Sequence, residues 1–332
     1  VSWKNPFSLL EAVGGDCAGA IGAYPHGDTP PSISEDIDVL DDKQLSDILT
    51  LIKRRPMLAG DDGYRLSLAG AQDKLAVGFD QGQVLLIKGG APTTHILKPI
   101  IDNITDSAHN ELFCMLLAKQ VGLDVPQASL HYVNDTPYYL VERYDRQQMP
   151  DGSITRIHQE DFCQALGIEP QCKYEREGGP SIATCQETIT QYAARPALDQ
   201  IKLLNRIVFN FLIGNADAHG KNFSLLYHQR KPQLAPAYDL FSTAIYPDLS
   251  DKMAMKIGGR YKPKEMYIRH FHRLVSDTKT ARLTLDKQIK SMTRNIMDAG
   301  NTLTNQLKQQ GLSSSVFNNI MSLINERVKR LS

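Results

Sequence analysis

The sequence predicts an α+β protein with a β-rich small lobe followed by a mostly helical large lobe. Two observations predict this class. Short strand-like runs dominate the first half of the chain, whereas helical periodicity dominates from about Asp151 onward. The 332 residues are 42% hydrophobic, enough for two lobes at about 100 to 200 residues per domain. We expect an N-terminal segment at 1–60 that packs on the small lobe, the small lobe at 61–146 and the large lobe at 147–332.

The expected elements of the small lobe follow from local patterns. Glycine-rich residues 14–22 predict a turn and a strand, and 25–34 predict a loop. Helical spacing of leucine and isoleucine predicts a short helix at Asp41–Leu51, and an apolar stripe predicts a second helix at 107–121. Strand-like runs occupy 64–68, 75–79, 84–87, 95–98 and 138–144.

Composition excludes several classes of protein. Lys plus Arg and Asp plus Glu both number 37, so no global charge points to nucleic acid or a membrane surface. The five cysteines are odd in number and contain no C-x-x-C pair, which favours a reducing cytoplasm over a disulfide framework or a zinc site. No run of about 18 apolar residues is present. We therefore expect a cytoplasmic protein without a membrane span.

The segment from Leu203 to Asp239 gives the strongest indication of chemistry. Apolar residues recur every three or four positions over 204–212, which predicts a buried helix that runs into a polar loop at 214–222. In that loop Asp217 precedes Asn222 by five residues, the D-x-x-x-x-N spacing of protein kinase catalytic loops. The spacing alone is weak, and a loop carboxylate at a helix end is the alternative.

A β-hairpin is expected directly after this loop, with strands at 223–227 and 233–238 and a turn at 228–232. Its two ends hold Asn222 and Asp239. Because paired strands lie about 5 Å apart, these two oxygen-donor side chains should meet near one point. Hard oxygen ligands suit Mg²⁺, so Asp239 would be the second metal ligand.

Other motifs are weaker. The run from Gly214 to Lys221 resembles a Walker A loop, but it has five residues between its glycines and Asn222 where Ser or Thr is required. Residues 14–22 contain no G-x-G-x-x-G. His219 has no second His or Cys at ligand spacing, so a loop-ordering role is the better interpretation.

Two features of the small lobe are compatible with phosphate binding. Small residues at 64–74 lie between two strand-like runs, where backbone N–H groups could approach phosphates, although an ordinary hairpin has the same pattern. Lys98 ends a predicted strand ahead of the helix that carries Glu111. This order is similar to that of the strand lysine and helix glutamate of kinases, with a solvated lysine as the alternative.

Together these segments resemble the HipA family of bacterial toxin kinases. Ordinary kinase motifs are absent, since Gly70 is the only glycine of the loop, Asn215-Ala216-Asp217 replaces H-R-D and Tyr238-Asp239-Leu240 replaces D-F-G. The matching segments are Pro6–Leu10, Ser67–Lys74, Thr93–Lys98, Gln159–Gln164, Lys173–Glu175, Gly178–Pro180 and Tyr267–Phe271.

The resemblance implies a two-lobed protein-kinase-like fold that uses ATP and Mg²⁺. It implies that Asp217 is the catalytic base, that Asn222 and Asp239 bind Mg²⁺, and that Ser67 is autophosphorylated. In the same family Lys98 contacts the ATP phosphates, Glu142 and Tyr144 hold adenine, and Lys74 with its loop covers the phosphates. The full set of implied ATP-binding residues is Lys74, Lys98, Glu142, Tyr144, Ala69, Gly70, Ala71, Gln72, His219 and Lys221.

The implied function is that of a toxin serine/threonine kinase of a toxin–antitoxin system, which phosphorylates an aminoacyl-tRNA synthetase and so halts translation and growth. The implied partner is a HipB-like DNA-binding antitoxin, through which the chain would reach DNA only indirectly. Long members carry a further N-terminal subdomain ahead of the segment matched by Pro6–Leu10. The chain resembles the short HipT form, in which a separate HipS protein supplies that piece, and a truncated HipA would look the same. A non-catalytic corepressor and a small-molecule kinase are the alternative functions.

Overall fold

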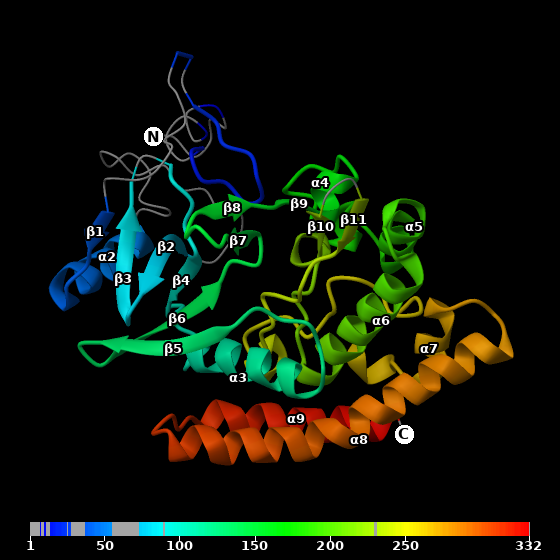
Figure 1. Cartoon of the computed structure of the whole chain (residues 1–332). Helices are drawn as coiled ribbons and strands as arrows, with labels where there is room; N and C mark the ends of the chain where they lie inside the picture. Colours follow the sequence, from blue (N-terminus) through cyan, green and yellow to red (C-terminus); the bar gives the residue numbers. More distant parts are fainter. Residues whose placement is uncertain are drawn as a thin grey trace. The chain divides into compact units, whose positions relative to one another are not determined.

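The structure is a computed structural model that describes Phe7, Leu10 and residues 14–24, 26–27, 37–54, 73–88, 90–228 and 231–331. The chain forms two compact units (Figure 1). The first comprises Val1–Ala108 and Pro126–Gln159, and the second comprises His109–Val125 and Glu160–Ser332. Strands predominate in the first unit and helices in the second, which confirms the predicted α+β class.

The first unit is built on an antiparallel sheet whose strands follow the order β1-β3-β2-β4-β6-β5 in the described part of the chain. The strands are β1 (Ile37–Val39), β2 (Leu75–Asp80), β3 (Gln83–Ile87), β4 (His95–Pro99), β5 (Ala128–Val133) and β6 (Thr136–Glu142). The strands predicted at 75–79, 84–87 and 95–98 are confirmed. The strand predicted at 138–144 ends earlier, at Glu142. The Arg143 N–H still donates to the Thr94 carbonyl at 2.8 Å, and the Arg143 side chain enters a buried ion cluster. The strand predicted at 64–68 lies outside the described residues.

Helix α2 (Asp42–Arg54) covers part of this sheet and confirms the helix predicted at Asp41–Leu51. Its first turn is capped because Asp41 accepts the Gln44 N–H at 2.7 Å while the Gln44 side chain accepts the Asp41 N–H at 3.0 Å. Leu45, Leu49 and Ile52 then fall on one buried face. They join a core made with residues of β2, β3, β4, β5 and β6.

A buried ion cluster ties the glycine-rich segment 14–19 to the chain that follows β6. The carboxylate of Asp16 accepts hydrogen bonds from Arg143 at 3.0 Å and from Arg146 at 2.6 Å. Asp145 accepts from the backbone N–H of Gly19 at 2.7 Å and forms ion pairs with the same two arginines. The turn predicted at residues 14–22 is thus held by charge in addition to local geometry, but the strand predicted there is absent, since this segment makes turns and a single bridge.

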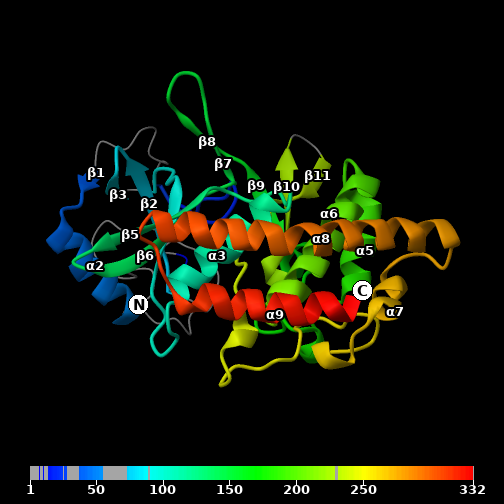
Figure 2. The ribbon, with the colours of Figure 1, turned by 90° about the horizontal axis from the view of Figure 1, so that it is seen from below.

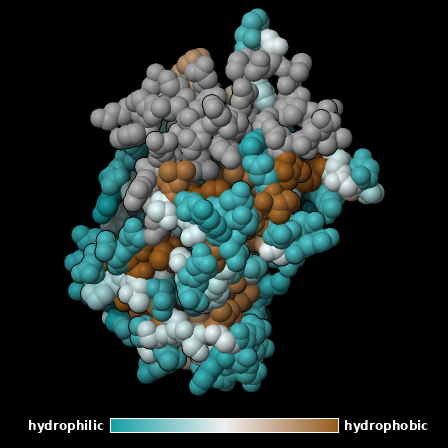
Figure 3. All heavy atoms as spheres, turned by 90° about the vertical axis from the view of Figure 1, so that its left-hand side faces the viewer, coloured by the Kyte–Doolittle hydropathy of each residue, from teal (hydrophilic) through white to brown (hydrophobic). Residues whose placement is uncertain are grey.

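The first unit also contains a two-stranded sheet of β7 (Arg146–Gln148) and β8 (Ile154–Arg156). Figure 3 shows a largely hydrophilic face on which hydrophobic side chains are visible between the polar ones. Exposed apolar side chains of this unit include Ile37, Val39 and Tyr132, which are 46%, 51% and 48% exposed. No helix among the described residues has both the length and the apolar character needed to cross a bilayer.

The second unit is assembled around helix α6 (Pro196–Ile213). Helices α8 (Lys279–Gln309) and α9 (Ser315–Leu331) lie side by side and both pack on α6 (Figure 2). Helix α3, whose residues from His109 onward belong to this unit, packs on α9 through stacked Phe113 and Phe317, with ring centroids 4.9 Å apart. The helix predicted at 107–121 is confirmed. The helices are α3 (Ser107–Gln120), α4 (Phe162–Ala165), α5 (Ile182–Tyr192), α6 (Pro196–Ile213), α7 (Ile268–Phe271), α8 (Lys279–Gln309) and α9 (Ser315–Leu331). Short 3₁₀ turns are η2 (Glu175–Glu177), η3 (Gly220–Asn222), η4 (Thr243–Ile245), η5 (Pro263–Glu265) and η6 (His272–Leu274).

A three-stranded sheet of β9 (His158–Asp161), β10 (Ser224–His228) and β11 (Lys231–Leu234) follows the order β11-β10-β9. The hairpin predicted after the polar loop is present as β10 and β11, but the second strand predicted at 233–238 is wrong in position. It begins earlier because Pro232 pairs with Tyr227 on an edge strand, where a missing N–H is tolerated. It ends earlier because the Ala237 N–H is bonded to the Asp124 carbonyl at 2.7 Å instead of to β10.

Candidate active site

The polar loop at 214–222 is held at both ends by the fold of the second unit. Gly214 ends α6 in the left-handed region with φ 79°, where an added Cβ would lie 2.5 Å from Cδ2 of Leu323. The Asn215 amide then donates to the side chain of Asn210 on α6 and to the Asp239 carbonyl, both at 3.1 Å. The start of the loop is therefore fixed both to its own helix and to the chain beyond the hairpin.

Asn222 and Asp239 meet as predicted, although β11 ends at Leu234 and Asp239 therefore lies beyond the observed hairpin. Nδ2 of Asn222 donates to Oδ2 of Asp239 at 3.1 Å, and Oδ1 of Asn222 accepts the backbone N–H of His219 at 3.1 Å. Among the residues that the structure describes, Asp239 is one of the few non-glycine residues with positive φ, at 51°. The carboxylate of Asp239 and Oδ1 of Asn222 are hard oxygen donors, and each keeps a lone pair beyond the hydrogen bond that it accepts. The donor set therefore fits Mg²⁺, which takes one or two protein ligands beside phosphate and water oxygens.

Asp217 lies in the same loop and is 51% exposed at its side chain. Its Oδ1 accepts a hydrogen bond from the hydroxyl of Tyr174 at 2.5 Å. Its Oδ2 lies 3.9 Å from Nε2 of His219, beyond hydrogen-bond distance. The structure thus places the predicted base at the surface of the second unit, in the same loop as Asn222, with one oxygen engaged by a tyrosine that the sequence analysis did not single out.

His219 is buried and contributes order rather than charge. Burial lowers its pKa to about 4, outweighing the opposite effect of Asp217, so the ring is neutral at pH 7. Its ring packs edge-on against Tyr174, with centroids 5.2 Å apart. This position favours the loop-ordering interpretation, while Lys221, in the next turn, is fixed by a hydrogen bond from the Tyr238 hydroxyl to its carbonyl at 2.8 Å.

The predicted ATP-binding residues of the first unit lie on or beside the large sheet. Lys98 in β4 is buried, and its ammonium group lies 5.7 Å from the centroid of the Tyr139 ring. Lys74, immediately before β2, is also buried, and Glu142 closes β6 opposite His95. The Tyr144 hydroxyl donates to the Gln159 side chain. Ser67, Ala69, Gly70, Ala71 and Gln72 lie outside the described residues.

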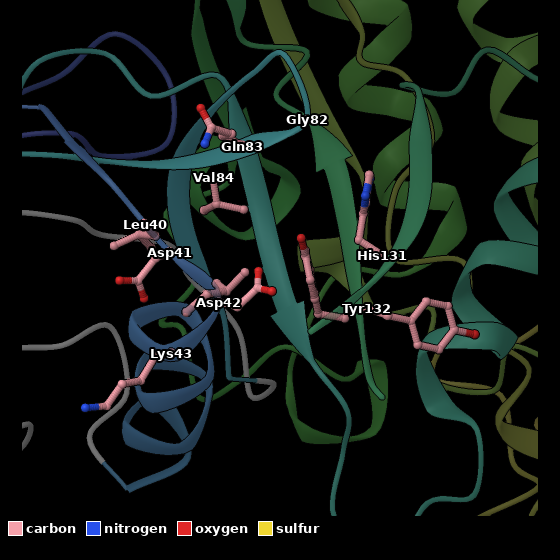
Figure 4. Close-up of a pocket in the computed structure, with 11 residues that line it drawn as sticks. Leu40, Asp41, Asp42, Lys43, Gly82, Gln83, Val84, His131 and Tyr132 are labelled. Atoms are coloured by element: carbon pink, nitrogen blue, oxygen red, sulfur yellow. The ribbon is translucent and has the colours of Figure 1, made fainter. Parts of the chain in front are cut away.

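Elements of the first unit also line a cavity of about 600 Å³ that the sequence analysis did not predict (Figure 4). Asp41 and Asp42 at the start of α2 contribute carboxylates, Gln83 and Val84 come from β3, and His131 comes from β5. None of the predicted ATP-binding or metal-binding residues lines it. No local pattern could have revealed this cavity, because its walls come from segments about 40 to 50 residues apart in the sequence.

Tyr174 is a residue of the candidate site that sequence reasoning missed. Lys173-Tyr174-Glu175 was one of the segments that carried the family resemblance, but no role followed from it. The hydrogen bond to Asp217 spans 43 positions of the chain, so spacing could not reveal it. The only available signal was a polar aromatic residue within a segment typical of the family.

The β-rich first unit, the helical second unit and a loop that carries Asp217 and Asn222 beside Asp239 are typical of the kinase-like class. A family model described as the HipA-like C-terminal domain matches residues 66–302. The chain is 48% identical over 270 residues to Y4mE of Sinorhizobium fredii, provisionally named a kinase, with 80% of this chain and 64% of that protein covered. It is 32% identical over 281 residues to the serine/threonine-protein kinase toxin HipA of Shewanella oneidensis, with 80% of this chain and 63% of that protein covered. The chain therefore belongs to the HipA family.

Solved structures agree with this assignment. HipA of Shewanella oneidensis, in a complex with HipB and operator DNA, matches with a TM-score of 0.83 at 27% identity over 100% of this chain and 80% of that one. The kinase CtkA of Helicobacter pylori matches with a TM-score of 0.54 at 13% identity, over 80% of this chain and 90% of that one, which shows the fold alone. The predicted kinase-like fold is thus confirmed. The chain spans just under two thirds of the length of the curated relatives it matches.

Proposed function

We propose that this protein is a serine/threonine protein kinase that transfers the γ-phosphate of ATP to a protein hydroxyl. One observation supports it above the others. Asp217 lies five residues before Asn222 in one loop, and the Asn222 side-chain nitrogen lies 3.1 Å from a carboxylate oxygen of Asp239. Phosphoryl transfer needs positioning and charge stabilisation more than covalent chemistry, and these residue types supply both.

In the proposed mechanism Asp217 accepts the proton of the acceptor hydroxyl as that oxygen attacks the γ-phosphorus, and the bond from that phosphorus to the bridging oxygen breaks, so that ADP leaves. Asn222 and Asp239 would hold Mg²⁺, which neutralises charge on the phosphate oxygens when it is bound. From the family resemblance, Lys98 contacts the phosphates, and Glu142 with Tyr144 holds adenine. The other residues proposed to bind ATP are Lys74, Ala69, Gly70, Ala71, Gln72, His219 and Lys221.

The proposed substrate is an aminoacyl-tRNA synthetase, and the proposed role is that of a toxin. The HipA of Shewanella oneidensis is named a toxin kinase and its structure contains HipB and operator DNA, which supports a HipB-like antitoxin as partner. A HipS-like small protein is a second proposed partner. The synthetases are overproduced one at a time in cells whose growth the kinase has arrested. We expect the synthetase for one amino acid to restore growth, and the substrate proposal is wrong if none of them does.

We also propose that Ser67 is autophosphorylated. A phosphate there would add about −1.5 to −2 charge to the segment proposed to cover the ATP phosphates, and the repulsion should weaken nucleotide binding. Calorimetry should show lower ATP affinity for the Ser67-phosphorylated protein than for the unmodified protein, with Ser67→Ala keeping the unmodified affinity. Equal affinities, or phosphate found only on other residues, would remove this switch.

Mass spectrometry of a phosphatase-treated bacterial extract incubated with the purified protein and ATP labelled at the γ-phosphate tests the proposed function. We expect label on serine or threonine of a few proteins, and little label with Asp239→Asn, which loses a metal ligand. Label recovered only in metabolites would favour the small-molecule kinase. If no protein or metabolite is labelled and the protein strengthens DNA binding by the antitoxin, the non-catalytic corepressor is favoured.

A further inference from the structure

The contact between Tyr174 and Asp217 joins the predicted base to a second, separately anchored segment. Asp217 is half-exposed, so packing alone does not fix its carboxylate. The Tyr174 hydroxyl donates to Oδ1 at 2.5 Å, a short distance typical of hydrogen bonds to a charged acceptor. Burial and this hydrogen bond both raise the pKa of Tyr174, so the hydroxyl keeps its proton and acts as the donor.

The segment that carries Tyr174 is held rigidly by backbone contacts. The carbonyl of Lys173 accepts the N–H of Gly220 at 3.2 Å, and the carbonyl of Tyr174 accepts the N–H of Gly179 at 2.9 Å. Both glycines are needed at this approach, because an added Cβ on Gly220 would lie 2.4 Å from Cγ of Pro180 and one on Gly179 would lie 2.6 Å from a carbonyl oxygen. The backbone of Tyr174 is therefore anchored, and its ring packs against His219 with centroids 5.2 Å apart.

A second set of contacts fixes the same segment to the loop of Asp217. The carboxylate of Glu175 accepts the N–H of Lys256 at 2.5 Å, and the Glu175 N–H donates to the carbonyl of Ala254 at 3.3 Å. The N–H of Ala254 in turn donates to the carbonyl of Ala216, next to Asp217, at 2.8 Å. The tyrosine and the aspartate thus belong to one connected framework within the second unit.

We infer that Tyr174 is a positioning residue that occupies Oδ1 of Asp217 and so presents Oδ2 to the acceptor hydroxyl. This inference rests on the proposed function of Asp217 as the base. Without the tyrosine hydroxyl, the half-exposed carboxylate can turn, and either oxygen faces the acceptor at the wrong angle for part of the time. Misplacement of this kind costs about 10- to 100-fold in rate without changing how tightly ATP binds.

The test compares Tyr174→Phe with a matched variant, Tyr227→Phe. Both substitutions remove only a hydroxyl bonded to a carboxylate of the second unit, since the Tyr227 hydroxyl donates to Glu160 in β9. Phosphate transfer from labelled ATP to proteins of a phosphatase-treated extract is measured as kcat and as the KM for ATP. We expect kcat to fall about 10- to 100-fold in Tyr174→Phe, with the KM for ATP and the melting temperature near wild type, and no comparable fall in Tyr227→Phe.

A double-mutant cycle separates positioning from a general structural effect. In an Asp217→Asn background, loss of the Tyr174 hydroxyl should change the residual rate by less than about twofold, because there is no carboxylate left to orient. Wild-type kcat in Tyr174→Phe, or a fall that is equally large in the Asp217→Asn background, overturns the inference. If wild type and Asp217→Asn label the extract equally, the proposed function itself fails.

Discussion

Replacement of Asp16 by asparagine should destabilise the first unit strongly, because this residue is the centre of a buried ion cluster. Its side chain is 0% exposed and accepts hydrogen bonds from Thr93, Arg143 and Arg146. Burial alone would raise the pKa of Asp16, but the neighbouring arginines outweigh burial and hold that pKa below its ordinary value. The carboxylate is therefore ionised at neutral pH, and asparagine removes its charge with almost no change of shape.

The magnitude follows from the charges that remain. Arg143 and Arg146 have side chains only 1% and 3% exposed, Arg156 also pairs with Asp16 but is 22% exposed, and Asp145 is the other carboxylate of the cluster. Removing one partner of a buried ion pair typically costs about 3 to 5 kcal/mol, because a charge is left without compensation. Since Asp145 still pairs with Arg143 and Arg146, we expect about 3 kcal/mol. For a domain of 150 to 250 residues this corresponds to a fall in melting temperature of about 6 to 12 °C.

Thermal and urea denaturation followed by circular dichroism measure the effect. Asp38→Asn is the matched control, because Asp38 pairs with Lys88 at 2.7 Å on the surface of the same unit, and exposed pairs contribute about 0 to 1 kcal/mol. A loss below about 1 kcal/mol in Asp16→Asn, or equal losses in both variants, would refute the argument that buried charge fixes residues 14–19.

Three further predictions concern the second unit. Gly220→Ala should lose about 1 to 3 kcal/mol of unfolding free energy in urea, because its Cβ would lie 2.4 Å from Cγ of Pro180; unchanged stability would show that the loop has room to move. Asn110→Ala should also lower the unfolding free energy by about 1 to 3 kcal/mol, because it leaves the buried N–H and carbonyl of Ser242 without the Asn110 side chain. A urea midpoint equal to that of the wild type would contradict this prediction. Burial lowers the pKa of His219 from 6.5 to about 4, so below pH 6.5 the unfolded chain binds this proton more readily than the folded chain does. The free energy of unfolding should therefore fall as pH drops from 6.5 toward 4, by up to about 1.4 kcal/mol per pH unit. Urea midpoints across that range should vary less in His219→Gln, and an identical slope would exclude His219 as the cause.

Local patterns predicted those parts of the fold that depend on neighbouring residues. Short apolar runs are sufficient for strands β2, β3 and β4, and helical spacing is sufficient for α2, since these apolar side chains must be buried. The meeting of Asn222 and Asp239 was predicted from the hairpin, but β11 ends at Leu234, so the position of Asp239 also depends on contacts beyond the strand, such as the hydrogen bond from the Asn215 amide to its carbonyl.

Features that depend on distant parts of the chain were not predictable. The second strand of the hairpin ends at Leu234 because Asp124, more than a hundred residues earlier, takes the N–H of Ala237. The same limit applies to the tyrosine that contacts Asp217 across 43 positions and to the charge cluster around Asp16. Sequence spacing indicates which residue types are available for chemistry, whereas their orientation is set by contacts that form only in the folded chain.

The central claim is that Asp217 acts as the base of a phosphotransfer reaction. The most direct test is the rate of serine phosphorylation from labelled ATP by the purified wild-type protein and by Asp217→Asn, together with the affinity of each for Mg·ATP. We predict that Asp217→Asn keeps its fold and its nucleotide affinity while the rate falls about 10²- to 10⁴-fold, as is typical when a general base is removed. Transfer at the wild-type rate by a folded Asp217→Asn protein would contradict the account.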